Sequence, residues 1–175
     1  MYLKNCYLHL KTITRHRNLV IFHCFKAGIP WRGLMHDLSK YTPTELFAGI
    51  RHYSDGTRSP NEKERELLGY SPAWMHHKGR NRHHFEYWND YNPNEKKVMP
   101  VPMPIPFFKE LICDRVAASK IYQGKNYTNQ HPLDYYLKGD VNRFIAPETS
   151  ELIIKTLTIL SEEGEDAMFH YLKQL

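Results

Sequence analysis

The sequence predicts an all-α protein, a compact helical bundle that forms one domain over residues 1–175. Three observations lead to this prediction. Apolar residues recur at three- and four-residue steps in several long segments, which is the spacing of one helix face. Thr-Pro and Ser-Pro pairs open two of these segments, as they do at helix N-termini. No segment shows the two-residue alternation between hairpin turns that indicates a strand.

The N-terminal third of the chain holds three predicted helices. Residues 6–27 carry an apolar face at helical spacing, and a Gly-Ile-Pro sequence ends the pattern. A short helix over residues 31–39 follows. Thr42 then precedes a proline and, at the third position after it, Glu45, which is the pattern of a capping box and predicts a helix through residue 53.

The rest of the chain continues the helical pattern. Ser59-Pro60-Asn61-Glu62 repeats the capping signature and opens a helical stretch toward His77, which Gly69 and Pro72 bend or divide. Residues 99–106 alternate apolar residues with proline, which predicts an extended connector. Apolar spacing predicts later helices over 107–122, 147–163 and 165–175, and we expect the helices within about 132–175 to complete the core or pair with another subunit.

Composition indicates an ordinary globular protein. Hydrophobic residues make up 41% and charged residues 25% of the 175 residues, which fits one domain and excludes a disordered chain. No stretch reaches the roughly 20 apolar residues that span a bilayer, so no membrane partner is expected. Lys4, His9 and Lys11 interrupt the apolar centre of a signal peptide, and the three cysteines form no CxxC pair. We therefore expect a reducing, cytoplasmic setting.

The balance of charge favours an anionic partner. The formal net charge is +5, and the densest basic segment is Lys78-Gly79-Arg80-Asn81-Arg82. Such a patch attracts phosphate on a small molecule as readily as it attracts nucleic acid, so charge does not decide between these partners.

Histidine is the unusual component, with eleven in 175 residues, about three times the number that an ordinary share of roughly 2% gives. Two of the candidate ligands are adjacent, His36 and Asp37. Adjacent side chains point about 100° apart on a helix, so both reach one ion only where the helix ends or lies close beside the site. Imidazole and carboxylate together suit divalent ions such as Zn, Fe and Mn.

Two isolated residues fit the same kind of site. His16 lies on the apolar face of the first predicted helix, where a lone histidine is more often a hydrogen-bonded core residue than a ligand. Asp114 lies on the apolar side of the 107–122 helix, where an unpaired carboxylate costs several kcal/mol. A metal ion is one partner that removes this cost, and Arg115 or another cation is the alternative.

A second histidine cluster contains His76, His77, His83 and His84, with Glu86 close behind. These five residues fall within eleven positions, which is far denser than chance allows. The clustering predicts a metal or substrate role for at least two of the histidines. Capping contacts, aromatic stacking and an exposed polar turn are the structural alternatives, and the choice within each adjacent pair stays open.

The order of these residues resembles the HD-domain superfamily of metal-dependent phosphohydrolases. The shared features are His36-Asp37 followed by Lys40, a histidine before them and an aspartate after the second cluster, over about residues 10–122. Residues 77–88 are similar to a subgroup of small bacterial and phage proteins. The linkers are shorter and richer in proline than in the large nucleotide-hydrolysing relatives, and no accessory nucleotide-binding segment is evident.

The resemblance implies an all-helical fold with the metal site in the bundle core. It assigns a first metal ion to His16, His36, Asp37 and Asp114. Asp37 would then bridge to a second ion, which is bound by His77 and by His83 or His84. One or two divalent ions are expected, with Zn, Mn, Fe, Mg, Ni and Co all compatible.

The leading functional prediction is phosphoester hydrolysis of a nucleotide or another small phosphorylated metabolite by an activated water. Asp37 would hold the water, Lys40, Arg80 or Arg82 would stabilise the phosphate unless they are only surface charges, and Glu86 would shuttle a proton or orient a histidine. One alternative is a di-iron oxygenase of the same superfamily. The other is a non-catalytic, metal-stabilised nucleic-acid-binding module, which the complete ligand set disfavours, and a homo-oligomer is compatible with all three.

Overall fold

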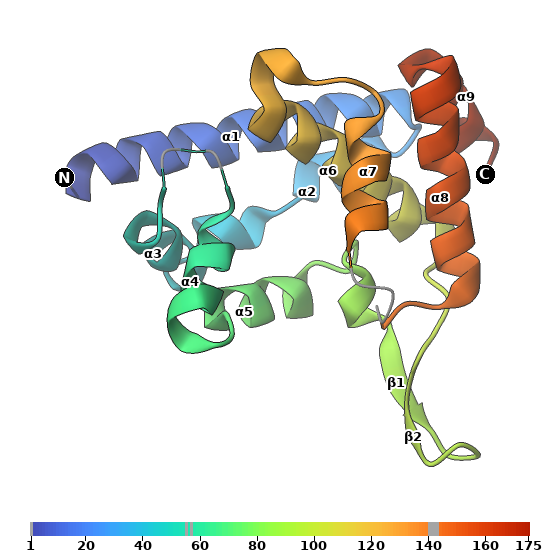
Figure 1. The fold of residues 1–175 in the computed structure, drawn as a ribbon, viewed down its shortest axis with the longest axis horizontal. Helices are drawn as coiled ribbons and strands as arrows, with labels where there is room; N and C mark the ends of the chain where they lie inside the picture. Colours follow the sequence, from blue (N-terminus) through green and yellow to red (C-terminus); the bar gives the residue numbers. More distant parts are fainter. Residues whose placement is uncertain (1, 55, 57, 140–143) are drawn as a thin grey trace.

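Helices form most of the molecule, as the sequence predicts (Figure 1). The computed structural model describes residues 2–54, 56, 58–139 and 144–175. The α-helices of this part are α1 (Tyr2–Lys26), α2 (Pro30–Met35), α3 (Pro43–Arg51), α4 (Pro60–Leu68), α5 (Pro72–Arg80), α6 (Ile105–Gln123), α7 (His131–Lys138), α8 (Pro147–Glu163) and α9 (Glu165–Gln174). Short 3₁₀ helices are η1 (Leu38–Tyr41), η2 (Phe85–Tyr87) and η3 (Gly124–Asn126). None of the helices in these ranges combines the length and apolar character needed to cross a membrane.

Most predicted helix boundaries are confirmed. α1, α6, α8 and α9 cover the segments that apolar spacing indicates. The stretch after Ser59 is divided where expected: Gly69 ends α4 with a left-handed φ of 80°, and Pro72 begins α5. The Ser59 side chain accepts a hydrogen bond from the backbone of Asn61, so this N-cap forms as predicted.

The predicted 31–39 helix is instead two short elements. α2 ends at Met35, and η1 begins at Leu38. Between them Asp37 adopts the left-handed conformation, with φ 53° and ψ 28°. This conformation ends a right-handed helix, and aspartate is one of the few residues other than glycine that tolerates it.

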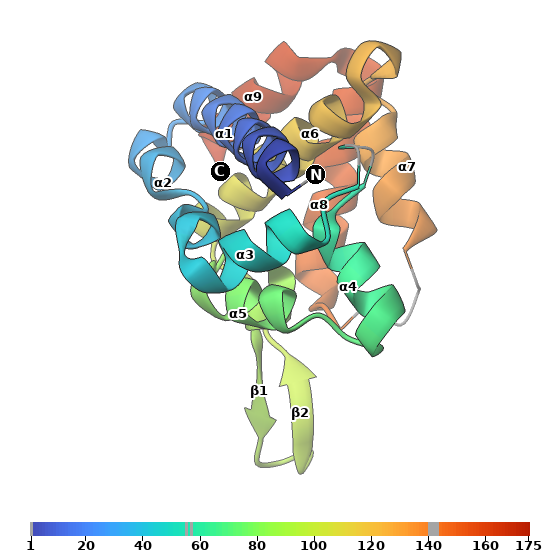
Figure 2. The same ribbon diagram turned by 90° about the vertical axis from the view of Figure 1, so that its left-hand side faces the viewer.

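The expectation that the chain has no strands is wrong. β1 (Asn89–Asn92) and β2 (Lys97–Pro100) form an antiparallel hairpin that projects from the helices in both views (Figures 1 and 2). Asn92 Oδ1 accepts hydrogen bonds from the backbone of the turn. Since neither face of the hairpin is buried, its strands carry no apolar alternation that the sequence could reveal. The connector predicted over 99–106 contains the end of β2 and the start of α6.

The hydrophobic core lies at one end of the molecule. Its main cluster is formed by the C-terminal part of α1 together with α6, α7, α8 and α9. Phe108, Ile112, Ile153 and Leu157 are completely buried within it. The C-terminal helices therefore share one core with the helices that carry His16 and Asp114.

Close packing of α1 against α2 depends on Gly33. A Cβ atom at this buried position would lie 2.6 Å from the Cβ atom of Cys24. We expect Gly33→Ala to lower the free energy of unfolding by about 1–3 kcal/mol, because the two helices must move apart. Gly79→Ala in α5 is the matched control, since no atom lies within 4 Å of its added Cβ, and it should raise stability by about 0.5–1 kcal/mol. Urea unfolding measures both, and equal effects would contradict the packing argument.

Candidate metal centre

Four segments bring seven potential metal ligands together. His16 comes from α1, His36 and Asp37 from the turn between α2 and η1, and Asp114 from α6. These four form what we call the first group. The second group consists of Asp37 with three histidines from the end of α5 and the loop after it, namely His77, His83 and His84. Within each group the ligand atoms all lie within 4.8 Å of one another, and Asp37 belongs to both.

The left-handed backbone at Asp37 explains how two adjacent residues face one site. On a continuous helix His36 and Asp37 would diverge by about 100°. Here α2 has ended and the chain turns, so that His36 Nε2 lies 3.2 Å from Asp37 Oδ2. The sequence requirement that a helix end at this pair is met by the backbone conformation of Asp37 itself.

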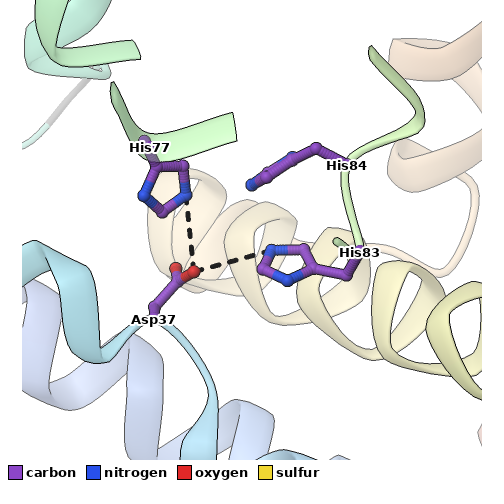
Figure 3. Close-up of side chains that lie close together, drawn as sticks. All are labelled: Asp37, His77, His83 and His84. Carbon is purple, nitrogen blue, oxygen red and sulfur yellow. Dashed lines mark ion pairs between the residues drawn. The ribbon is translucent and has the colours of Figure 1, made fainter. Parts of the chain in front are cut away.

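The second group surrounds the Asp37 carboxylate. The Nε2 atoms of His77 and His83 lie 3.4 and 3.5 Å from its Oδ1 atom, and the His84 ring extends toward the same space (Figure 3). All three histidines belong to one short segment of the chain, which comprises the last turn of α5 and the loop before η2. The structure thus places His77, not His76, in the group, and it includes both His83 and His84.

The first group centres on Asp114. Its Oδ1 atom lies 2.8 Å from His16 Nε2 and 3.5 Å from His36 Nε2. Its Oδ2 atom lies 3.8 Å from His83 Nε2, so His83 contacts the carboxylates of both groups. Both oxygens of Asp114 therefore lie near histidine nitrogens.

Two buried glutamates contact the histidine rings at Nδ1, on the side away from the candidate metal positions. Glu110 accepts a hydrogen bond of 2.9 Å from His36 Nδ1 and lies 3.2 Å from His83 Nδ1. Glu45 accepts 2.7 Å hydrogen bonds from the Nδ1 atoms of His77 and His76. A carboxylate that holds Nδ1–H fixes the tautomer and leaves Nε2 as the donor atom for a metal ion. Glu110 forms a third compact set with His36 and His83, but its contacts to their Nδ1 atoms indicate the orienting role.

Sequence reasoning missed both glutamates. Glu45 fits the capping-box pattern, yet the Thr42 side chain makes no capping hydrogen bond and instead donates to the carbonyl oxygen of Ser39. Glu110 carried a usable signal, because it stands one helical turn before Asp114 on the buried face of α6. A second buried carboxylate at that spacing needs a partner for the same reason that the first one does.

The described residues alone leave the ligand atoms unsatisfied. The Nε2 atoms of His16, His36, His83 and His84 and both oxygens of Asp37 are buried and form no hydrogen bond among the described residues, although His16 Nε2 lies in ion-pair range of Asp114. Lys40 forms an ion pair with Asp37, at 2.7 Å from Oδ2, but it reaches only one of these atoms. Buried polar atoms of this kind are costly and rare in native proteins. Nitrogen and oxygen donors with this arrangement fit a divalent transition-metal ion.

The charges of the centre point in the same direction. Burial alone would raise the pKa of Asp37, but the neighbouring charges of His36 and Lys40 hold it well below its usual range. Burial would also raise the pKa of Asp114, and contacts with His16 and His36 hold that pKa well below its usual range. The pKa of His36 is raised well above its ordinary value, because the carboxylates around it outweigh the effect of burial. Positive charge beside the carboxylates thus comes from His36 and Lys40, and a bound cation would take over the part of His36, whose ring must be neutral to act as a ligand.

The remaining predicted site residues lie at different distances from the centre. Lys40 is in it, through the ion pair with Asp37. Arg80 and Arg82 line a neighbouring pocket with His83. Glu86, in η2, belongs to neither group. The role of orienting a histidine, which the sequence suggested for Glu86, is filled by Glu45 and Glu110.

Comparison with known proteins identifies a family for this chain. The model of a family of unknown function, DUF5662, matches residues 5–159. This span contains every residue of both groups and both orienting glutamates. No curated protein and no solved structure matches the chain.

Proposed function

This chain belongs to DUF5662, a family of unknown function, and we propose that it is a metal-dependent hydrolase of phosphoester bonds in small phosphorylated compounds. The observation that carries the proposal is that two compact ligand groups share Asp37. A carboxylate between two histidine-rich groups is the arrangement expected of a two-ion centre, and two-ion centres are typical of phosphoester-cleaving enzymes. We further propose that the fold is of the HD type, on the order of His16, His36-Asp37, the second histidine cluster and Asp114.

The proposed ligands follow from the two groups. His16, His36, Asp37 and Asp114 would hold one ion, and Asp37, His77, His83 and His84 would hold the other. When bound, divalent ions provide Lewis acidity and lower the pKa of water toward neutrality. Glu110 and Glu45 contribute by keeping the Nε2 atoms of three ligands, His36, His83 and His77, turned toward the centre.

Lys40 is the residue best placed to meet a phosphate group. Its ammonium lies 2.7 Å from Asp37, and its side chain is 29% exposed, so it stands between the buried centre and solvent. Burial would lower the pKa of Lys40, but the charge of Asp37 raises it, and the side chain therefore stays protonated. A protonated lysine at this edge attracts an anionic substrate and stabilises charge that develops on a phosphoryl oxygen.

A di-iron oxygenase is the second candidate, and the number of histidines favours it. Five of the seven proposed ligands are imidazoles, a donor set that suits iron as well as zinc or manganese. His84 adds to this set: burial and the nearby His83 hold its pKa well below its usual range, so the ring is neutral, as a metal ligand must be.

Metal content and activity, measured on the same sample, test the proposal. We expect about two equivalents of transition metal in protein purified without an affinity tag or chelator. The same protein should release p-nitrophenolate from p-nitrophenyl phosphate or its diester, and a chelator should abolish the activity. Re-addition of the native metal is the control for damage by the chelator. Iron with no hydrolysis of a panel of nucleotides and phosphate esters would favour the oxygenase. No bound metal, and no thermal stabilisation when divalent ions are added, would refute both.

A further inference from the structure

A pocket rich in arginine lies next to the metal centre. It has a volume of about 360 Å³ and is formed by α2, the loop after α5 and the start of α6. Three arginines line it, Arg32, Arg80 and Arg82, and Trp31 and Phe107 supply aromatic surface. We call this cavity the arginine pocket.

The arginine pocket carries more positive than negative charge. Arg32 is engaged, because its Nε donates a 2.8 Å hydrogen bond to Glu110 and its guanidinium covers the Phe107 ring at 3.8 Å from the centroid. Arg80 and Arg82 have no carboxylate within 4.0 Å among the described residues. Among the described residues, Arg80 donates to the His76 carbonyl oxygen in its own helix, and Arg82 lies over the Tyr87 ring at 5.4 Å from the centroid. Two guanidinium groups are therefore available to an anion, against one glutamate that Arg32 already neutralises.

The pocket is separate from the metal centre. Only His83 and Glu110 belong to the surroundings of both. His83 is 1% exposed, with Nε2 toward Asp37 and Nδ1 toward Glu110. The other six proposed metal ligands do not line the pocket. A ligand in the pocket would thus lie behind His83 and would not contact the ions.

We propose that the arginine pocket is a second ligand site, which binds a phosphate monoester carrying a flat ring, of the nucleoside monophosphate class. Free guanidinium groups recognise the phosphate by charge-assisted hydrogen bonds. A volume of about 360 Å³ lies within the range of small-molecule sites and leaves space beyond the phosphate. Trp31, which is 72% exposed, offers a face on which a ring can stack.

Such a site would communicate with the metal centre through two contacts. Arg32 lies 2.8 Å from Glu110 Oε2, and Glu110 Oε1 holds His36 Nδ1 at 2.9 Å. A phosphate that attracts Arg32 weakens its pair with Glu110, which leaves more of the glutamate charge for His36 and His83. The position therefore suits an effector rather than a substrate, and its occupancy does not depend on the proposed hydrolase activity.

Calorimetric titration with AMP and with inorganic phosphate tests the proposal. The titrations use the full chain as purified, with its metal in place, so that residues 30–88, which form most of the pocket, keep their structure. We expect AMP to bind, the double variant Arg80→Ala/Arg82→Ala to bind it at least about tenfold more weakly, and Trp31→Ala to lower affinity for AMP but not for phosphate. Arg51→Ala, at an exposed position in α3 outside the pocket, is the matched control.

Three results would overturn the assignment. AMP binding that Lys40→Ala weakens as much as the double variant does would place the phosphate at the metal centre. Equal binding by the double variant, with an unchanged circular dichroism melting curve, would remove the arginines from the site. An affinity for AMP that does not change in Trp31→Ala would show that the ring of the ligand does not stack on Trp31. Because these variants leave every proposed metal ligand intact, none of the results depends on whether the centre is a hydrolase.

Discussion

Asp37→Asn should remove both metal ions and reduce phosphoesterase activity to background. Among the described residues, Asp37 is the one that belongs to both groups, and it is 2% exposed. Asparagine keeps the shape of the side chain and tolerates the left-handed backbone at this position. It offers one neutral oxygen where the carboxylate offers two charged ones. The metal content measured by elemental analysis should therefore fall from about two equivalents to near zero, and the activity should fall with it.

The control for this variant is Asp90→Asn, at an exposed position in the β1–β2 hairpin. It makes the same chemical change far from the groups and should leave metal content and activity unaltered. Circular dichroism of both variants reports whether the fold persists. A folded Asp37→Asn protein that keeps its full metal content would show that Asp37 does not bridge two ions.

Glu110→Gln should weaken the affinity for both ions by about 10–100-fold, which is the usual effect of losing a residue that orients a metal-binding histidine. Glu110 contacts His36 of the first group and His83 of the second, and it also pairs with Arg32. Glutamine keeps the size of the side chain but has one acceptor oxygen for three donors, so at least one ring is released. The measurement is competition with a chromophoric chelator.

Glu45→Gln provides the matched comparison. Glu45 contacts only one proposed ligand, His77, besides the non-ligand His76. We therefore expect this variant to weaken the affinity for the ion of the second group by a similar factor and to leave the affinity for the other ion unchanged. If Glu110→Gln bound both ions as tightly as the unaltered protein, the orienting role would be excluded.

The sequence predicted the helices and most members of the two groups of candidate ligands for a common reason. α1 and α6 bury a continuous apolar face, so their spacing is visible, and His16 and Asp114 stand out because polar residues interrupt that face. His36-Asp37 and the four histidines near α5 stand out by density alone. These signals are local, and the pairing of distant residues into two groups came only from the resemblance to HD proteins.

The features that sequence missed depend on contacts between distant segments or on exposed backbone. Glu45 meets His77 across more than thirty positions of chain, and nothing near Glu45 distinguishes it from a helix cap. The hairpin has no buried face and hence no apolar period. The arginine pocket joins α2 to the loop after α5, so its lining becomes visible only in three dimensions.

The placement of the hydrophobic core has a consequence for how the molecule holds together. Among the described residues, the main core cluster takes no buried side chain from α2, α3, α4 or α5, although these helices and the turns beside them carry most of the proposed ligands. Ions between His16 and Asp114 on one side and His77 and His83 on the other would act as cross-links that fasten this weakly anchored half to the rest. Amide hydrogen exchange in residues 30–88 would then be fast in the metal-free protein and slow in the metal-bound protein. The amides of α6, α8 and α9 would stay protected in both states.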